Sequence, residues 1–84
     1  MKHAREDYAR IQDPENKIGE DEPVMLFRAQ DKFFIDVLYF YRALLERDNP
    51  KSELIPLVTD HIKRVYAWQQ DNADKVKFPD YKPG

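Results

Sequence analysis

One arginine stands at a junction between two apolar segments. Its side chain and its position suggest a site that binds an anion. The stretch EPVMLFRAQD, residues 22–31, places Arg28 directly after Phe27 and two residues before Gln30. A guanidinium is a planar fork that suits phosphate or carboxylate. A helix that begins near Asp31 would add free N–H groups and a positive dipole end. The alternative is an internal salt bridge with Asp31, and both interpretations remain open.

Aromatic side chains further along the chain could supply a stacking surface beside that arginine. Tyr39 and Tyr41 lie in the next segment, and Arg64 in a later one could add a second cation. Gln30 could add a hydrogen bond to a base or a sugar. The predicted ligand-binding residues are therefore Arg28, Gln30, Tyr39, Tyr41 and Arg64, and the predicted ligand is a small nucleotide-like anion.

Signatures of an enzyme or a metal centre are missing from the sequence. The chain has no cysteine, and its two histidines, His3 and His61, form no HExxH pattern or close ligand pair. It has no glycine-rich phosphate loop, serine-centred elbow or paired-carboxylate signature. We therefore expect no catalytic residue, no metal and no cofactor. His61 falls on an apolar helical face, which favours a core or interface histidine.

Composition narrows the class of protein and of partner. Eighty-four residues make one small domain, expected to span 1–84, with a formal net charge of −2. A generic nucleic-acid binder would usually carry a strong basic excess instead. The N-terminus MKHAREDYAR has no apolar core of a signal peptide, and no apolar run approaches the roughly 20 residues of a membrane span. The expectation is a soluble cytoplasmic protein without a membrane partner.

The elements that must position these side chains are predicted to be mainly α-helical. Apolar residues recur at helical spacing over about 31–47 and 53–72. Asp48-Asn49-Pro50 predicts a turn between the two helices, with Asp31 and Ser52 as candidate N-caps. Two helices joined so tightly form an antiparallel hairpin. The second helix is expected to have one apolar face, made of Leu54, Leu57, Val58, His61, Val65 and Trp68. Ile62 and Tyr66 lie just beside it.

The flanking segments are less regular. Residues 1–12 predict a short, marginal helix, 13–30 a loop and arm, and 73–84 an extended tail. The arm at about 22–28 is expected to be extended, although Val24 to Phe27 could also form the first turn of a long helix. As a strand, the arm would need a partner from another chain. Phe78 and Tyr81 could anchor the tail, which is otherwise frayed.

The first predicted helix is apolar nearly all round. Its stripes consist of Phe33, Val37, Phe40, Leu44 and Leu45; of Phe34, Leu38 and Tyr41; and of Ile35 and Tyr39. Such a helix needs neighbours on most sides, and one further helix cannot supply them. We therefore predict that homo-oligomerisation completes the fold. The alternative is that the tail and the N-terminal helix fold back over it.

Two stretches, EDEPVMLFRAQD and HIKRVYAWQQ, together resemble small uncharacterised proteins of bacteriophages and prophages. The resemblance covers roughly residues 13–70, and Met25 and Phe27 stand where phenylalanine and leucine are more usual. The residues that carry it are Glu22, Pro23, Arg28, Gln30, Asp31, His61, Arg64 and Trp68.

A phage origin implies a function class. Small oligomeric phage proteins are often inhibitors of host defence, which block a host protein or sequester a nucleotide signal. The expectation is a non-enzymatic protein of the host cytoplasm that sequesters a nucleotide-like anion at a subunit interface. The alternatives are a protein-binding inhibitor or adaptor of a host defence protein, and a structural oligomer.

Overall fold

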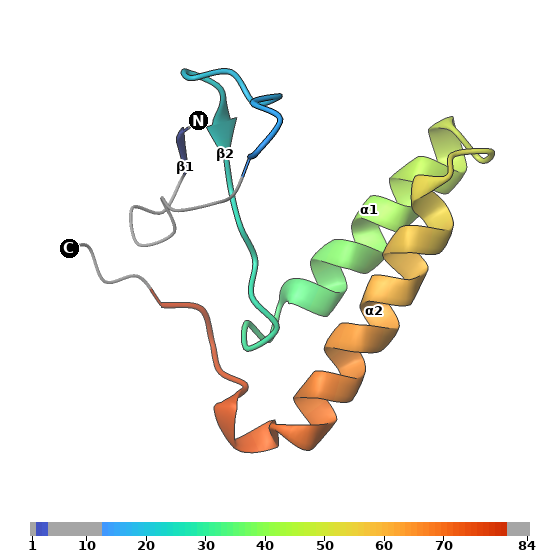
Figure 1. Cartoon of the computed structure of the whole chain (residues 1–84). Coiled ribbons are helices and arrows are strands. Elements are labelled where there is room, and N and C mark those ends of the chain that lie inside the picture. Colours follow the sequence, from blue (N-terminus) through green and yellow to red (C-terminus); the bar gives the residue numbers. More distant parts are fainter. Residues whose placement is uncertain (1, 4–12, 81–84) are drawn as a thin grey trace. The chain divides into compact units, whose positions relative to one another are not determined.

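The computed structural model describes residues 2–3 and 13–80 of the chain (Figure 1). Its elements follow the order β1 (Lys2–His3), β2 (Pro23–Val24), α1 (Phe34–Asp48), α2 (Leu54–Asp71) and the 3₁₀ turn η2 (Ala73–Lys75). The chain divides into two compact units. One comprises Met1–Phe27 with Asp80–Gly84, and the other, here called the hairpin unit, comprises Arg28–Pro79.

Within the arm predicted at about 22–28, Pro23–Val24 form the short strand β2, and no residue of the arm is helical. β2 pairs in parallel with β1, with Lys2 opposite Pro23 and His3 opposite Val24. The strand therefore finds its partner in its own chain, and the expectation of a partner from another chain is wrong. Pro23 fits an edge position because it has no N–H to donate.

The predicted helix over 1–12 is wrong at Lys2–His3, which form β1. The rest of that prediction falls on residues 4–12, which lie outside the described part of the chain. The following loop is organised by Asp13, whose carboxylate accepts the backbone N–H groups of Lys17 (3.1 Å) and Ile18 (3.0 Å). Local bonds of this kind are the usual way in which an aspartate competes with helix formation.

The helical hairpin is confirmed, with the helix ends shifted slightly. α1 begins at Phe34 because Asp31 first builds a turn: its carboxylate accepts the N–H of Phe33 (2.8 Å) and its carbonyl that of Phe34 (3.0 Å). The N-cap position is therefore Phe33 and not Asp31. At the second helix Glu53 holds the N-cap position, while the Ser52 hydroxyl accepts the N–H of Leu54 (3.1 Å).

The core lies along the seam between the two helices and is small. Its buried residues are Leu38, Val58, Ile62 and Val65. Around them pack the partly buried side chains of Ala29, Phe34, Ile35 and Leu45. The predicted face of α2 is therefore rotated: Ile62 is in the core, whereas Leu57 and His61 are exposed. Periodicity locates a face on one helix, but the contact with the other helix decides which part of it is buried.

The tail does not fray at its start, because residues 76–79 bind the segment that precedes α1. The backbone N–H of Lys77 donates to the carbonyl of Gln30 (2.9 Å), and the carbonyl of Lys77 accepts the N–H of Lys32 (3.0 Å). Phe78 packs edge-on against Phe33, with ring centroids 5.9 Å apart. Phe78 thus makes one contact of the kind predicted for it, and Tyr81 lies outside the described residues.

Candidate functional site

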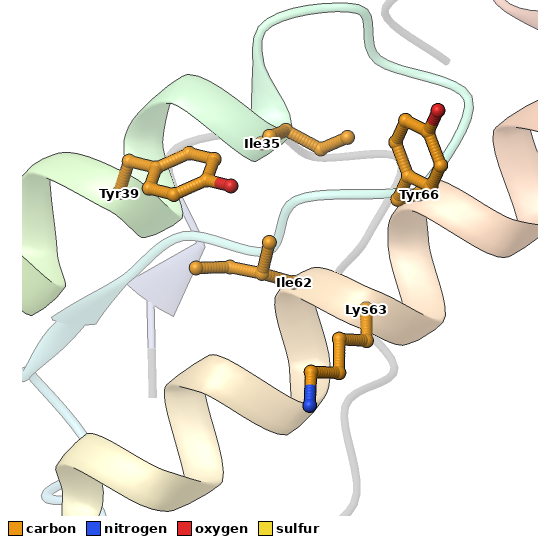
Figure 2. Close-up of a pocket in the computed structure, with 5 residues that line it drawn as sticks. All are labelled: Ile35, Tyr39, Ile62, Lys63 and Tyr66. Atoms are coloured by element: carbon orange, nitrogen blue, oxygen red, sulfur yellow. The ribbon is translucent and has the colours of Figure 1, made fainter.

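A groove runs beside the seam on one side of the hairpin (Figure 2). It has a volume of about 320 Å³, which is at the lower end of the range for small-molecule sites. Its lining consists of Ile35 and Tyr39 from α1 and Ile62, Lys63 and Tyr66 from α2. All five residues belong to the hairpin unit, so one chain forms the whole groove.

The same four-residue spacing builds both walls of the groove. Ile35 and Tyr39 are four residues apart on α1, and Ile62 and Tyr66 are four apart on α2. Residues at this spacing lie one above the other on a helix. Because the helices run in opposite directions, each tyrosine faces the isoleucine of the other helix across the groove, as Figure 2 shows.

The groove combines an apolar floor, aromatic walls and one cation. Ile62 is only 6% exposed, whereas Tyr39 and Tyr66 are 48% and 57% exposed and keep ring surface available. Lys63 lines the edge with its aliphatic stem and directs its ammonium group outward (Figure 2). Within residues 13–80 Lys63 makes no ion pair. The arrangement suits a flat ring that carries a negative charge.

Arg42, on α1, contacts the ring of Tyr39 and also bonds to α2. Its guanidinium carbon lies 4.9 Å from the centre of the Tyr39 ring. It donates a hydrogen bond from Nη1 to the hydroxyl of Thr59 on α2 (3.1 Å). Its Nε lies 3.8 Å from a carboxylate oxygen of Glu46 one turn further along α1. The Arg42 side chain is only 26% exposed, so it is held rather than freely solvated.

Two of the predicted ligand-binding residues lie in the segment that leads into α1. Arg28 is exposed, and its carbonyl accepts the N–H of Asp31 (3.0 Å). Gln30 is half-buried, and its carbonyl is taken by Lys77. Neither residue lines the groove.

The other three predicted residues are separated by the turn of their helices. Tyr39 is the one member of the predicted set that lines the groove. Tyr41 lies two residues further along α1, which is about 200° further round the helix. Arg64 is 75% exposed and forms an ion pair with Asp60 at 3.1 Å. The structure thus does not bring the five predicted residues together.

Sequence reasoning missed four residues of the groove: Ile35, Ile62, Lys63 and Tyr66. A signal for most of them was present, because isoleucine followed four residues later by tyrosine occurs once in each helix. Two helices with the same pair, packed antiparallel, can place both pairs on a common side. Lys63 carries no such signal, since it reads as part of a solvated helical face.

The described residues contain no cluster of histidine, aspartate and glutamate that could hold a metal ion. His61 is exposed and lies edge-on to the Phe34 ring, with centroids 5.8 Å apart. Among the described parts of the chain, no helix has the length and apolar character needed to cross a bilayer.

Comparison with protein-family models, curated proteins and solved structures gives no match to this chain.

Proposed function

We propose that the protein is a non-enzymatic binding protein that sequesters a small, nucleotide-like anion and thereby counters a host antiviral defence. The observation that carries the proposal is the groove, in which two half-exposed tyrosines flank an apolar floor with Lys63 at the rim. The defence role rests on the resemblance to phage proteins.

Each part of the groove matches one part of such a ligand. A base would stack on the rings of Tyr39 and Tyr66, which gives about 1–3 kcal/mol per base at aromatic sites in proteins. The phosphate would meet the ammonium group of Lys63, whose flexible stem lets it turn toward the ligand. The groove holds one ring comfortably at about 320 Å³. One nucleotide unit for each chain is therefore the expected stoichiometry.

Titration calorimetry tests the proposal with adenosine and guanosine monophosphates and their 3′,5′-cyclic forms. We expect binding of at least one of these nucleotides. Tyr66→Ala should weaken it about tenfold or more because a stacking face is lost. Lys63→Met should weaken nucleotide binding but leave the binding of the uncharged nucleoside unchanged. Arg64→Met on the opposite side of α2 is the matched control and should bind like the wild type.

The outcome that contradicts the proposal is equally definite. No heat of binding for any of the four nucleotides would refute it. Nucleotide binding could also be unchanged in Tyr66→Ala and Lys63→Met but weaker in Arg28→Ala. That result would place the binding site in the segment before α1 and not in the groove.

We propose further that two copies associate through an apolar face on the other side of the hairpin. This face comprises Val37, Phe40, Tyr41, Leu54 and Leu57, all of which are exposed. Val37 and Tyr39 lie about 100° on either side of the buried Leu38, which puts the apolar face and the groove on opposite sides of α1. Ligand binding and association can therefore occur together.

Size and charge both favour a second copy as the occupant of this face. Phe40 and Tyr41, 68% and 45% exposed, together offer roughly 170–280 Å² of ring surface. A standard interface buries about 800 Å² on each partner, so the rings supply a substantial share. Between Val37 and Leu45 the one charged residue is Arg42, which is bonded to Thr59. A face without net charge meets its own copy with no like-charge repulsion.

Sedimentation velocity tests the association. The wild type should exceed the 10.1 kDa of one chain at micromolar concentration, and Phe40→Glu should return it to that mass. Phe78→Glu is the control, since Phe78 is similarly exposed (65%) but lies outside the apolar face. A wild type that stays monomeric at all concentrations would refute this part.

The exposed apolar face also supports a rival function, inhibition of a host defence protein. Leu57 is 64% exposed and Phe40 68%, and a contiguous exposed apolar patch can mark a protein-binding surface. A pull-down from bacterial lysate separates the two functions. The rival would be favoured if the wild type captured a host protein in stoichiometric amount and retained no small molecule, and if Phe40→Glu abolished this capture.

A further inference from the structure

Arg42 links a wall of the groove to the opposite helix. It does not line the groove, yet it touches the Tyr39 ring, which does. The hydrogen bond to Thr59 crosses from α1 to α2, and Glu46 approaches from the same helix. Thr59 and Glu46 therefore approach the guanidinium from two directions, while its carbon lies 4.9 Å from the centre of the Tyr39 ring.

Such a contact restricts the ring that it touches. Tyr39 is 48% exposed, and a side chain this open would otherwise sample several rotamers. A cation within about 6 Å of a ring centre attracts it. A guanidinium can donate hydrogen bonds along its edge and stack with its face at the same time, which an ammonium group cannot. The Tyr39 ring is thus held before any ligand arrives.

We propose that Arg42 is a positioning residue that fixes the ring of Tyr39 as a wall of the groove. It acts through Tyr39 and not by contact with the ligand. Its effect on affinity rests on the proposed function, because a wall held in advance saves the cost of ordering a side chain upon binding. Losing that saving corresponds to roughly a three- to tenfold weaker affinity.

Two substitutions separate the two kinds of contact that Arg42 makes. Arg42→Met keeps a long side chain but removes the charge and every donor. Arg42→Lys keeps the charge but cannot stack and bond to Thr59 together. Arg47→Met is the matched control, because Arg47 lies on the same helix, is 68% exposed and bonds to Asp48 rather than to a groove residue.

The primary measurement uses the full chain without ligand. Nuclear magnetic resonance of ¹³C-labelled tyrosine rings reports the order of the Tyr39 and Tyr66 side chains separately. In Arg42→Met we expect Tyr39 to lose order while Tyr66 does not, and in Arg42→Lys an intermediate Tyr39. A general loss of stability would change both rings alike. Tyr39 order that is the same in Arg42→Met, Arg47→Met and the wild type would overturn the inference.

The second measurement is titration with the four nucleotides named above. Where the wild type binds one of them, Arg42→Met should weaken it about three- to tenfold and Arg47→Met should not. Unchanged affinity in Arg42→Met would overturn the link between ring order and binding. Where the wild type binds none, the proposed function fails, and the ring measurement still decides whether Arg42 positions Tyr39.

Discussion

The two ends of the hairpin unit are held by different kinds of contact. At the closed end, which comprises residues 47–55, every hydrogen bond joins neighbours, such as Ser52 N–H to the carbonyl of Asn49 (2.9 Å). At the open end, residues far apart in the chain meet. The amide nitrogen of Gln69 donates to the carbonyl of Ala29 (2.9 Å), forty positions away, and the 76–79 segment binds Gln30 and Lys32.

The closed end can therefore form from local contacts alone, whereas the contacts of the open end require that the two helices are already packed. Contacts between neighbours cost little loop entropy and form as soon as the turn forms. Long-range contacts at the open end appear only after the helices have packed. The open end should therefore be the first part of the hairpin unit to open. The groove lies between the ends, with Ile35 near the start of α1 and Tyr66 near the end of α2, which is the open end.

The largest predicted effect comes from the seam that both ends share. Ile62→Ala removes buried apolar volume from a core of four buried residues, and we expect a loss of about 2–4 kcal/mol in the free energy of unfolding. Urea denaturation measures it. Leu57→Ala, at an exposed position of the same helix, should cost less than about 1 kcal/mol. Similar losses in the two variants would mean that the seam is not the main support.

The next largest effect should be confined to the open end. Gln69→Ala removes the side-chain donor to the carbonyl of Ala29 and the longer contact to that of Asp31, which keeps the N–H of Phe34, at a cost of about 1 kcal/mol. Hydrogen exchange should accelerate at the amides of Lys32 and Lys77 but not at that of Ser52. The exposed neighbour Gln70 provides the control substitution. Equal acceleration at both ends would show that they open as one unit.

A smaller effect is expected at the closed end. Ser52→Ala removes the hydroxyl that accepts the N–H of Leu54, and we expect a loss of about 0.5–1 kcal/mol. Ser52→Thr keeps a hydroxyl and should restore most of the stability, which thermal unfolding can measure. If Ser52→Ala accelerated exchange at Lys77 as much as Gln69→Ala does, the separation between the two ends would be lost.

The smallest effect concerns acid stability at the same end. The hydrogen bond from Arg47 lowers the pKa of Asp48 below its ordinary value of 3.8. Its stabilising contribution is therefore complete above that value and disappears as the pH falls through the lower pKa of the folded protein. Asp48→Asn should slightly reduce the fall in melting temperature between pH 6 and pH 3. Since both side chains are exposed, this reduction should be small, and a fall that Asp48→Asn leaves unchanged would point to another carboxylate.

The sequence predicted the closed end well because its signals are local. Asp48-Asn49-Pro50 ends one helix, and Ser52 assists the start of the next within a residue of the predicted place. The extended arm was predicted too, but its pairing with Lys2–His3 was not. Nothing in either short segment specifies the other, since a two-residue strand carries almost no pairing information.

The groove was harder to predict because it depends on how one helix is rotated against the other. Tyr39 and Tyr41 were both predicted to bind the ligand, yet only Tyr39 lines the groove together with Ile62 and Tyr66. The face of α2 was expected to include His61 with Ile62 just beside it, whereas packing buries Ile62 with Val58 and Val65 and leaves His61 exposed. The rotation follows from side-chain interlocking along the whole seam, which no single spacing reveals.

The bond between Lys77 and Gln30 also determines where the chain enters and leaves the hairpin unit. Arg28 and Pro79, the limits of that unit, are brought within a distance that about five or six extended residues can cover. A short linker from Pro79 to Arg28 could therefore close the unit into a ring, with new termini opened in the turn at 49–52. Such a circular permutant would retain both walls of the groove, and its stability would reveal how much of the fold depends on chain order.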